Sequence, residues 1–287
     1  MQNNINRLPI IIIGMHRSGT SMLTRMLEEL GLFMGKEKES NHEALFFLRL
    51  NDWLLRQSGG AWDHPEPIKH LLNNTQVRAL MMDYIRYMMK TPRVVSYLGW
   101  GKYLRYRTPA NLDIPWGWKD PRNTYTLPIW LDLFPDAKVI HIYRNGVDVA
   151  NSLKVRAEKI LVNSKALYLR RKLLYWVRPK KGGFTHSLRC VNLSGGFSLW
   201  TDYLREAQSH VRSLGSNAIE IKYEDFLADP YTSLKYICKF CELEINDEII
   251  RQVSGKVKKG RAYAYKDKPE LQTFAAQVAD RLKLFGY

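Results

Sequence analysis

The 287-residue sequence predicts a three-layer α/β/α fold, in which a P-loop-like parallel sheet is flanked by helices. Apolar runs at residues 9–13, 137–143 and 217–223 lack the alternation of half-exposed strands, so each suits a strand buried on both faces. Stretches with helical spacing of apolar residues separate these runs, as in a sheet with right-handed β–α–β crossovers. We expect one domain over residues 1–287.

Further elements follow from local patterns. Apolar residues at helical spacing predict helices over residues 21–32 and 41–58. Residues 94–97 are expected to form a short extended piece. Residues 116–122 are expected to be a strand end that runs into a turn, because Pro121 disfavours a helical conformation at the residue before it.

The charge balance is strongly basic, with 44 Lys and Arg against 28 Asp and Glu and a formal net charge of +16. Such a surface attracts nucleotides, nucleic acid, anionic lipid or acidic glycans without choosing among them. Residues 154–189 contain eleven Lys or Arg, one Glu and several Leu, Tyr and Trp. We interpret residues 154–190 as a basic insertion. It is either a solvated face or an amphipathic surface for an acidic substrate, an acceptor or a membrane.

Cys238 and Cys241 form a C-x-x-C pattern, which alone would indicate a redox pair or half of a zinc site. No second Cys or His pair stands at ligand spacing. The surrounding residues 236–243 resemble the end of an amphipathic helix, so we expect both thiols to be small buried apolar groups. No metal site is expected.

Targeting signals are weak. The apolar run near the N-terminus is too short and too early for a signal peptide, and no small-residue cleavage site follows it. No stretch approaches the roughly 20 apolar residues that cross a bilayer. The sequence therefore predicts a cytoplasmic protein, with peripheral membrane contact through the basic insertion as a further expectation. It leaves the oligomeric state open.

Residues 14–19, Gly-Met-His-Arg-Ser-Gly, match the G-x-x-x-x-G half of a P-loop between a buried strand and a helix. Backbone N–H groups and a helix N-terminus there make a cradle for an anion. A nucleotide triphosphatase would continue with Lys, but Thr20 and Ser21 follow, and Arg17 lies inside the loop. This pattern suits a ligand without a metal-bridged β/γ-phosphate pair, such as 3′-phosphoadenosine-5′-phosphosulfate (PAPS).

A second anion site is expected after the strand at residues 137–143. Arg144 follows this strand, and Ser152 lies eight residues on, in a predicted helix. The Arg fork and the Ser hydroxyl supply enough donors for a second phosphate. Taken alone, an Arg after a strand is more often a surface residue or a salt-bridge partner.

Four ordered motifs together resemble the PAPS-dependent sulfotransferase superfamily. They lie at residues 14–20, 118–122 (Trp-Lys-Asp-Pro-Arg), 143–152 and 222–230. The Arg-Ser-Gly-Thr form of the first is similar to the tyrosylprotein branch and to many bacterial members. Gly146 departs from the Pro or basic residue that bacterial members often have there. The resemblance implies transfer of a sulfuryl group from PAPS to a hydroxyl or amine acceptor, with 3′,5′-ADP as product and no required metal.

The resemblance also implies residue roles. Arg17 would contact the bridging oxygen of the donor, and Lys119 would be the second cation. Glu43 would be the general base, because an acidic residue precedes a Leu-Asn-Asp helix in related bacterial sequences, and the neighbouring His42 is the alternative. The remaining donor-binding residues implied are Gly14, His16, Ser18, Gly19, Thr20, Ser21, Arg144, Ser152, Tyr223, Lys259, Gly260 and Arg261.

Two other functions remain open at this point. A P-loop small-molecule kinase would share the glycine loop, although Thr20 stands where its lysine would be. A non-catalytic polyanion or membrane-surface binder would explain the +16 charge. For a sulfotransferase, the acceptor could be a carbohydrate, a glycolipid or other lipid-linked sugar, or a small alcohol, and no nucleic acid is expected.

Overall fold

A computed structural model describes residues 7–258 and 260–287, so the prediction for Lys259 lies outside the described residues. The chain forms two compact units. The first consists of the residues up to Tyr143 together with Tyr203–Ala262, and the second of Arg144–Asp202 with Tyr263–Tyr287.

The first unit is built on a parallel four-stranded sheet with strand order β2-β1-β3-β4. The strands are β1 (Ile10–Ile13), β2 (Gly117–Lys119), β3 (Lys138–Tyr143) and β4 (Ala218–Lys222). Ile12 of β1 pairs with Lys119, and Ile13 pairs with His141, so the carboxyl ends of β1, β2 and β3 meet at one edge. The predicted parallel sheet flanked by helices is confirmed.

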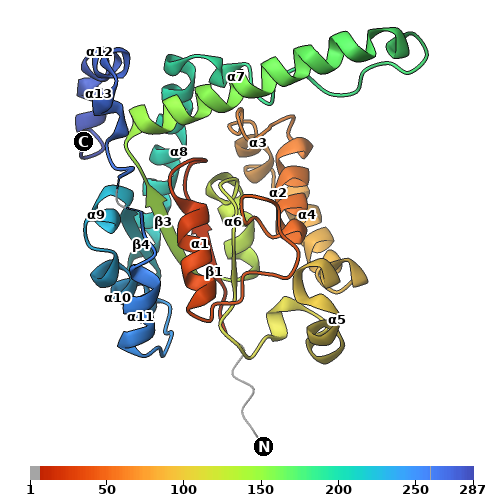
Figure 1. The fold of residues 1–287 in the computed structure, drawn as a ribbon. Helices are drawn as coiled ribbons and strands as arrows, with labels where there is room; N and C mark the ends of the chain where they lie inside the picture. The colour runs from red at the N-terminus through yellow and green to blue at the C-terminus, as the bar shows by residue number, and fades with distance from the viewer. Residues whose placement is uncertain (1–6, 259) are drawn as a thin grey trace, which may run out of the picture. The chain divides into compact units, whose positions relative to one another are not determined.

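Helices cover both faces of this sheet (Figure 1). On one face, apolar side chains of three helices pack against alternate residues of the strands, such as Ile10, Ile12 and Ile140. These helices are α1 (Thr20–Glu29), α10 (Pro230–Phe240) and α11 (Asp247–Ser254). The strands are buried on both sides, which explains why their sequences show no alternation.

An aromatic cluster fills the other side. Trp118 of β2 stacks on Phe47 with ring centroids 4.0 Å apart, and its ring centroid lies 5.1 Å from that of Trp130. Phe47 lies in α2 (Leu45–Gln57) and Trp130 in α6 (Asn123–Leu133). The other helices of the first unit are α3 (Ile68–Leu72), α4 (Thr75–Met88), α5 (Val95–Tyr106) and α9 (Tyr223–Ala228), with short 3₁₀ turns η1 (Pro92–Val94), η2 (Pro109–Asn111) and η5 (Gly215–Asn217).

Two local predictions were wrong. Residues 94–97 are helical and belong to η1 and α5, where Pro92 opens the first turn with a preset φ. The Tyr97 ring packs on Phe47 with ring centroids 4.8 Å apart. This tertiary packing outweighs the strand preference of the β-branched residues Val94 and Val95. The helix expected from residue 41 begins only at Leu45, because an antiparallel bridge between Lys38 and Ala44 holds the preceding residues in a loop.

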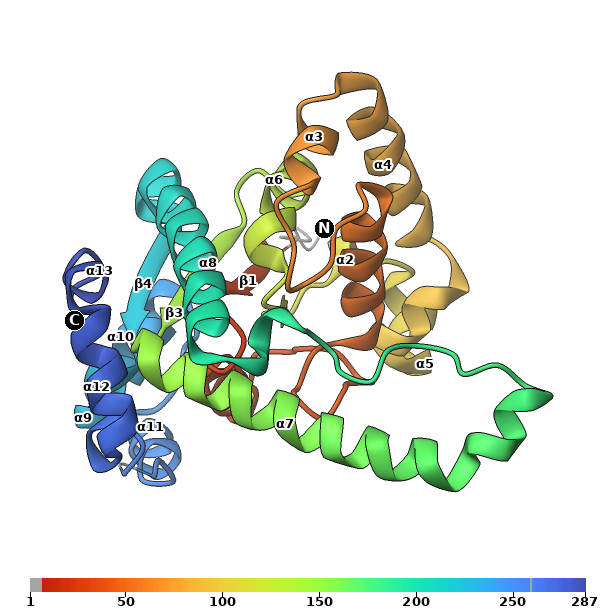
Figure 2. The same cartoon turned by 90° about the horizontal axis from the view of Figure 1, so that it is seen from above.

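The second unit is helical. Its long helix α7 (Gly146–Arg171) is capped by Asn145, whose side-chain oxygen accepts the Val147 N–H at 3.0 Å. The chain then turns back through residues 172–192 towards α8 (Leu193–Leu214), which crosses from the second unit into the first (Figure 2). The remaining elements are η3 (Lys172–Trp176), η4 (Arg189–Val191), η6 (Ala264–Asp267), α12 (Pro269–Gln277) and α13 (Ala279–Lys283).

The cysteine prediction is confirmed. Cys238 lies in the last turn of α10, and Cys241 caps that helix. Both thiols are buried, and burial raises the pKa of Cys238 to about 11 and that of Cys241 to about 12. Few thiolates therefore form at neutral pH. No helix in the described parts of the chain is both long and apolar enough to cross a membrane.

Candidate active site

The loop between β1 and α1 depends on two glycines. Gly14 has φ 134°, and a Cβ there would stand 2.3 Å from the Ile142 carbonyl oxygen. Gly19 has φ 96°, and a Cβ there would stand 2.5 Å from the Tyr223 ring. Only glycine fits both the backbone conformation and the space at these positions. The loop therefore lies directly against β3 and the start of α9.

The polar groups of this loop suit an anion. Gly19 precedes the first turn of α1, where no side chain caps the helix and no acidic residue is present. The first N–H groups of a helix have no intrahelical acceptor and attract anions. Ser18 is fully buried, and its hydroxyl has no hydrogen-bond partner among the described residues. Arg17 is exposed at φ 71°, a strained conformation that functional sites often contain.

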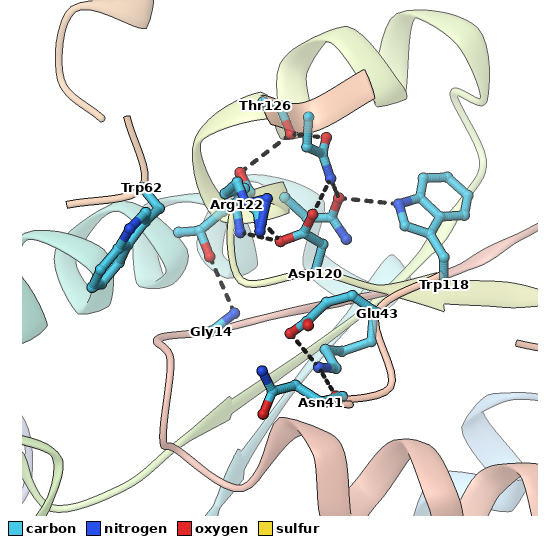
Figure 3. Close-up of polar contacts among 12 residues, drawn as sticks. Gly14, Asn41, Glu43, Trp62, Trp118, Asp120, Arg122 and Thr126 are labelled. Carbon is cyan, nitrogen blue, oxygen red and sulfur yellow. Dashed lines mark hydrogen bonds and ion pairs between the residues drawn. The ribbon is translucent and has the colours of Figure 1, made fainter. Parts of the chain in front are cut away.

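Lys119 contacts both the first turn of α1 and the predicted base Glu43. Figure 3 labels its partners Glu43 and Asn41. Its Nζ donates to the Glu43 Oε1 at 2.7 Å and to the Asn41 carbonyl oxygen at 2.5 Å. Nζ also lies 3.3 Å from the Ser21 hydroxyl in the first turn of α1. The Ser21 hydroxyl donates to the same Asn41 carbonyl at 2.6 Å. The fold thus brings Glu43, Lys119 and Ser21, which are far apart in sequence, into one cluster.

The Lys119–Glu43 pair is buried. The Lys119 side chain is 0% exposed and that of Glu43 is 5% exposed. Burial lowers the pKa of Lys119, and the Glu43 carboxylate offsets part of that effect. A desolvated cation acts strongly on any charge beside it, because little water screens the interaction. The Glu43 carboxylate is therefore held in a fixed place next to the phosphate loop.

The His42 side chain faces helix α1. The residue adopts φ 64°, and its Nδ1 stands 3.6 Å from Glu28 Oε2 on α1. Partial burial lowers its pKa, against the opposing pull of the Glu28 carboxylate. Of the two candidate bases, Glu43 is the one whose side chain contacts Lys119.

A second carboxylate, Asp120, organises the turn after β2. It is fully buried, and burial raises its pKa. Its oxygens accept from Asn51 Nδ2 at 3.0 Å and from the Arg122 N–H at 2.9 Å, and Arg122 Nε forms an ion pair with it at 3.3 Å. Asn123, next in the chain, accepts from the Trp118 ring N–H at 3.0 Å (Figure 3). These contacts hold the turn that follows Lys119, and they fix the position of Arg122 within it.

His16 and Gly14 are also anchored. The His16 ring meets Trp62 edge to face at 4.8 Å. The Gly14 N–H donates to the Thr124 hydroxyl at 3.1 Å, which is the dashed line at Gly14 in Figure 3. Thr124 lies in the first turn of α6. The loop is therefore held from the side of α6 as well as from α1.

In the second unit, Asp148 holds Arg144. Arg144 Nη2 donates to Asp148 Oδ2 at 3.0 Å, one helical turn away. The backbone N–H groups of Ala264 and Tyr265 also donate to Asp148, at 3.2 and 2.8 Å. One carboxylate thus orients the Arg144 guanidinium and fixes the segment that follows Arg261. Ser152 lies two helical turns after Gly146, half-buried in α7.

A cavity of about 550 Å³ lies in the first unit beside α1. Tyr223, whose ring touches Gly19, forms part of its wall together with Met22. The only carboxylate among its lining residues is Glu29, which pairs with Lys256 at 2.6 Å. The cations in its wall are Arg25, Lys256, Lys258 and Arg261. Gly260, which lies between Lys258 and Arg261 in the sequence, is exposed. The cavity thus joins the phosphate loop to a set of cations.

A family comparison agrees with this arrangement. A model of the Sulfotransferase family matches residues 9–247. The chain belongs to the Sulfotransferase family. The matched range of this sulfotransferase contains the loop at residues 14–19, Glu43, Lys119 and Arg144, and it ends before Arg261.

The fold of this sulfotransferase is also found in a solved structure. A sulfotransferase domain from the olefin synthase of Synechococcus PCC 7002 is 18% identical, with 99% of this chain and 97% of that chain covered and a TM-score of 0.52. A sulfotransferase domain from the curacin biosynthetic pathway is 18% identical, with 95% and 98% covered and a TM-score of 0.49. At these identities the likeness concerns the fold alone. A comparison with curated proteins found no match.

Sequence reasoning missed several residues of this candidate site. The Asn41 carbonyl that binds Lys119 is a backbone group, which no residue pattern reveals. Arg122 stood in the Trp-Lys-Asp-Pro-Arg motif and could have been found as a cation beside Lys119. Trp62 and Thr124 carry no local signal. Within residues 7–258 and 260–287, no group of three or more His, Cys, Asp and Glu side chains could hold a metal ion.

Proposed function

We propose that this sulfotransferase takes its sulfuryl group from PAPS and transfers it to the hydroxyl of a carbohydrate, a glycolipid or a small alcohol, with Glu43 as general base. The observation that carries the proposal is the buried Lys119–Glu43 pair at 2.7 Å, whose ammonium also lies 3.3 Å from Ser21 of the phosphate loop. A carboxylate and a cation thus stand together beside the loop that we propose binds the anion.

The residues present fit the 5′ end of PAPS. Gly14 and Gly19 allow close approach, as a Cβ at either position would collide with neighbouring atoms. The buried Ser18 hydroxyl is a donor that a phosphate oxygen would satisfy, since leaving such a group unpaired costs free energy. Thr20 and Ser21 add the first N–H groups of α1. Arg17, which lies inside the loop, would neutralise charge on the bridging oxygen.

The chemistry divides among the chain's own residues. Sulfuryl transfer breaks the bond between sulfur and the bridging phosphate oxygen and forms one to the acceptor oxygen. Glu43 would accept the acceptor's proton, for which it needs hydrogen-bond reach to that hydroxyl. Lys119 and Arg17 would stabilise the charge that develops on the transferred group and on the departing phosphate. Burial of Lys119 strengthens this effect, because water is excluded.

We assign the 3′-phosphate to Arg144 and Ser152. Asp148 already fixes the guanidinium of Arg144, and a guanidinium carries five N–H donors. Gly260 and Arg261 belong to the same proposal, as does Lys259. The adenosine would occupy the cavity beside α1, where Met22 and Tyr223 offer apolar and aromatic surface. The cations of that cavity favour a nucleotide with an extra phosphate.

Calorimetric titration with 3′,5′-ADP at moderate salt tests the donor. We expect binding without Mg²⁺, weakened at least tenfold by Arg144→Ala, because a charge-assisted contact to phosphate is lost. The control is Arg205→Ala, an exposed cation of α8. Tight binding of ATP–Mg²⁺ with none of 3′,5′-ADP would instead establish the kinase alternative. Binding of anionic polymers alone would establish a non-catalytic protein.

A second experiment finds the acceptor. The enzyme is incubated with PAPS labelled in the sulfuryl group and with separate lipid and aqueous extracts of the source cell. Label in the lipid extract identifies a glycolipid, and label in the aqueous extract identifies a carbohydrate or a small alcohol. Mass spectrometry of the labelled product then names the compound. Label that remains in PAPS with every fraction would contradict the proposal.

A further inference from the structure

The end of α7 and the turn after it expose apolar side chains at the surface. Leu173 is 89% exposed and Trp176 is 92% exposed, while Leu174 and Val177 are 64% and 73% exposed. Four large apolar groups in five positions form a surface that the fold itself does not bury. Exposed clusters of this kind mark interaction sites.

Cations surround this apolar group. Between residues 159 and 181 the chain carries eight Lys or Arg and no acidic residue. The nearest carboxylate in sequence, Glu158, pairs with Lys154 at 3.5 Å. Hence this stretch, which we name the basic arm, carries no carboxylate of its own to neutralise its charge. Its cations are Lys159, Lys165, Arg170, Arg171, Lys172, Arg178, Lys180 and Lys181.

The end of the basic arm is an organised turn. Tyr168 of α7 stacks on Tyr175 with ring centroids 5.9 Å apart, and Phe184 meets Tyr168 edge to face at 5.5 Å. Lys180 lies over the Phe184 ring at 4.5 Å and donates to the Gly182 carbonyl at 2.6 Å. These contacts tie the returning chain to the helix. Figure 2 shows the path of this turn as a ribbon. Tyr175 is half-buried, whereas its neighbours Leu174 and Trp176 are exposed.

Two alternatives leave the apolar side chains unexplained. A basic face that is only solvated does not need four exposed apolar residues. A soluble polyanion would contact the cations alone. An anionic bilayer uses both. Lys and Arg are attracted to the negative surface, while Trp and Leu enter the boundary between headgroups and acyl chains. Trp prefers that boundary in particular. We propose that the end of the basic arm, residues 170–178, docks this protein on an anionic membrane. The inference does not depend on the proposed donor, base or acceptor.

Vesicle flotation of the full-length protein tests this. The vesicles contain either phosphatidylcholine alone or phosphatidylcholine with about 30% phosphatidylserine, at 0.1 M salt. We expect partition to the anionic vesicles only. Each cation near the surface changes the partition coefficient about fivefold, so Arg170→Gln/Arg171→Gln/Lys172→Gln should lower it about a hundredfold. Leu173→Ser/Trp176→Ser should lower it at least tenfold, because the apolar groups that enter the lipid are lost.

Matched controls use similar residues elsewhere. Trp100→Ser/Leu104→Ser removes two exposed apolar residues of α5, where the neighbouring Arg105 is paired with Asp113 at 2.9 Å. Arg205→Gln/Lys239→Gln/Lys268→Gln removes the same number of exposed charges outside the basic arm. Both control variants should keep at least a third of the wild-type partition. Circular dichroism spectra and thermal unfolding midpoints of all variants should match those of the wild type, which shows that the variants are folded.

Three outcomes would overturn the proposal. Equal partition to neutral and anionic vesicles would remove the role of the cations. Full partition of Leu173→Ser/Trp176→Ser would show a purely electrostatic polyanion binder. A wild-type dimer in sedimentation that the same double variant converts to monomer, without any vesicle binding, would show that this surface pairs two copies of the chain.

Discussion

Two groups of cations in this protein have opposite surroundings. Lys119 is fully buried, and its ammonium meets the Glu43 carboxylate, the Asn41 carbonyl and the Ser21 hydroxyl within 3.3 Å. The cations of the basic arm stand on an exposed helix and turn with no acidic residue in their own stretch. A buried cation with fixed partners can act on one bond. A set of exposed cations acts as a diffuse field on a large anionic surface.

The difference predicts different responses to substitution. Removing a partner of Lys119 leaves a charge without compensation in a site that excludes water, which is costly in stability and in rate. Each cation of the basic arm contributes a similar small amount to the attraction to an anionic surface. Removing one of them therefore weakens that attraction only in part. The predictions below test this contrast, beginning with the largest expected effect.

Glu43→Gln should lower the rate of sulfuryl transfer about a thousandfold, because the amide cannot accept the acceptor's proton. Binding of 3′,5′-ADP should change less than about twofold, since the phosphate loop is retained. The free energy of unfolding should fall by about 3 kcal/mol, because the buried Lys119 charge loses its partner. Turnover is therefore measured at a temperature where circular dichroism shows the variant folded.

Two neighbours of Glu43 serve as controls. Glu39→Gln alters an exposed carboxylate of the same loop, and His42→Ala alters the alternative base, which faces Glu28. Each should keep at least about a third of wild-type turnover, as expected for groups outside proton transfer. Turnover above a tenth of wild type in Glu43→Gln would remove it as the base.

Lys119→Met should lower kcat about a hundredfold, because one preorganised donor to the developing charge is lost. Lys119→Arg should not restore it, since a planar guanidinium cannot occupy the place of a compact ammonium that is closed in by three oxygens. Lys172→Met, at the end of the basic arm, should leave kcat unchanged. If kcat fell equally in the Lys119 and Lys172 variants, the two groups of cations would not differ in their effect on catalysis.

Gly19→Ala should weaken 3′,5′-ADP binding at least about tenfold, because its Cβ would displace the Tyr223 ring at the edge of the phosphate loop. Gly31→Ala is the matched control. Gly31 has a similar φ of 88°, but a Cβ there meets nothing within 4 Å. Both variants should lose about 1 kcal/mol of stability from backbone strain, and only the first should lose affinity. Equal affinities in the two variants would show that the loop does not hold the ligand.

The pKa of Lys119 predicts a dependence of stability on pH. Burial lowers the pKa of this lysine below its ordinary value of 10.5. Between the lowered pKa and 10.5 the unfolded state binds more protons than the folded state, so the free energy of unfolding rises with pH. The slope reaches at most about 1.4 kcal/mol per pH unit. Denaturant titrations across this window should show the rise for wild type relative to Lys119→Met. No such rise should separate wild type from Lys172→Met.

Local signals predicted much of the fold. Four isoleucines in a row and two further apolar runs predicted three strands of the parallel sheet, and the turn before Pro121 predicted the end of the fourth. The prediction of an extended conformation for residues 94–97 was wrong because the packing of Tyr97 on Phe47 decides their conformation. The first residues of the expected helix at 41–58 form a loop for a similar reason, since a bridge from Lys38 to Ala44 holds them.

The site was less accessible to sequence reasoning. Glu43 and Lys119 were predicted separately from motif resemblance, and their contact spans 76 positions, which only the folded sheet brings together. The motif before the Leu-Asn-Asp helix favoured Glu43 over His42, but it could not show that the two side chains face different partners. That difference depends on the left-handed backbone at His42 within the bridged loop. Asp148 was a further omission, since its role depends on backbone N–H groups more than a hundred residues away.

The most direct test of the account is transfer from PAPS labelled in the sulfuryl group, with the acceptor fraction identified as above. Wild-type protein should move the label to the acceptor and release one 3′,5′-ADP for each label transferred, without Mg²⁺. Glu43→Gln should bind 3′,5′-ADP and transfer no label above background. A protein that leaves PAPS intact and instead moves the γ-phosphate of ATP to an acceptor would contradict the account.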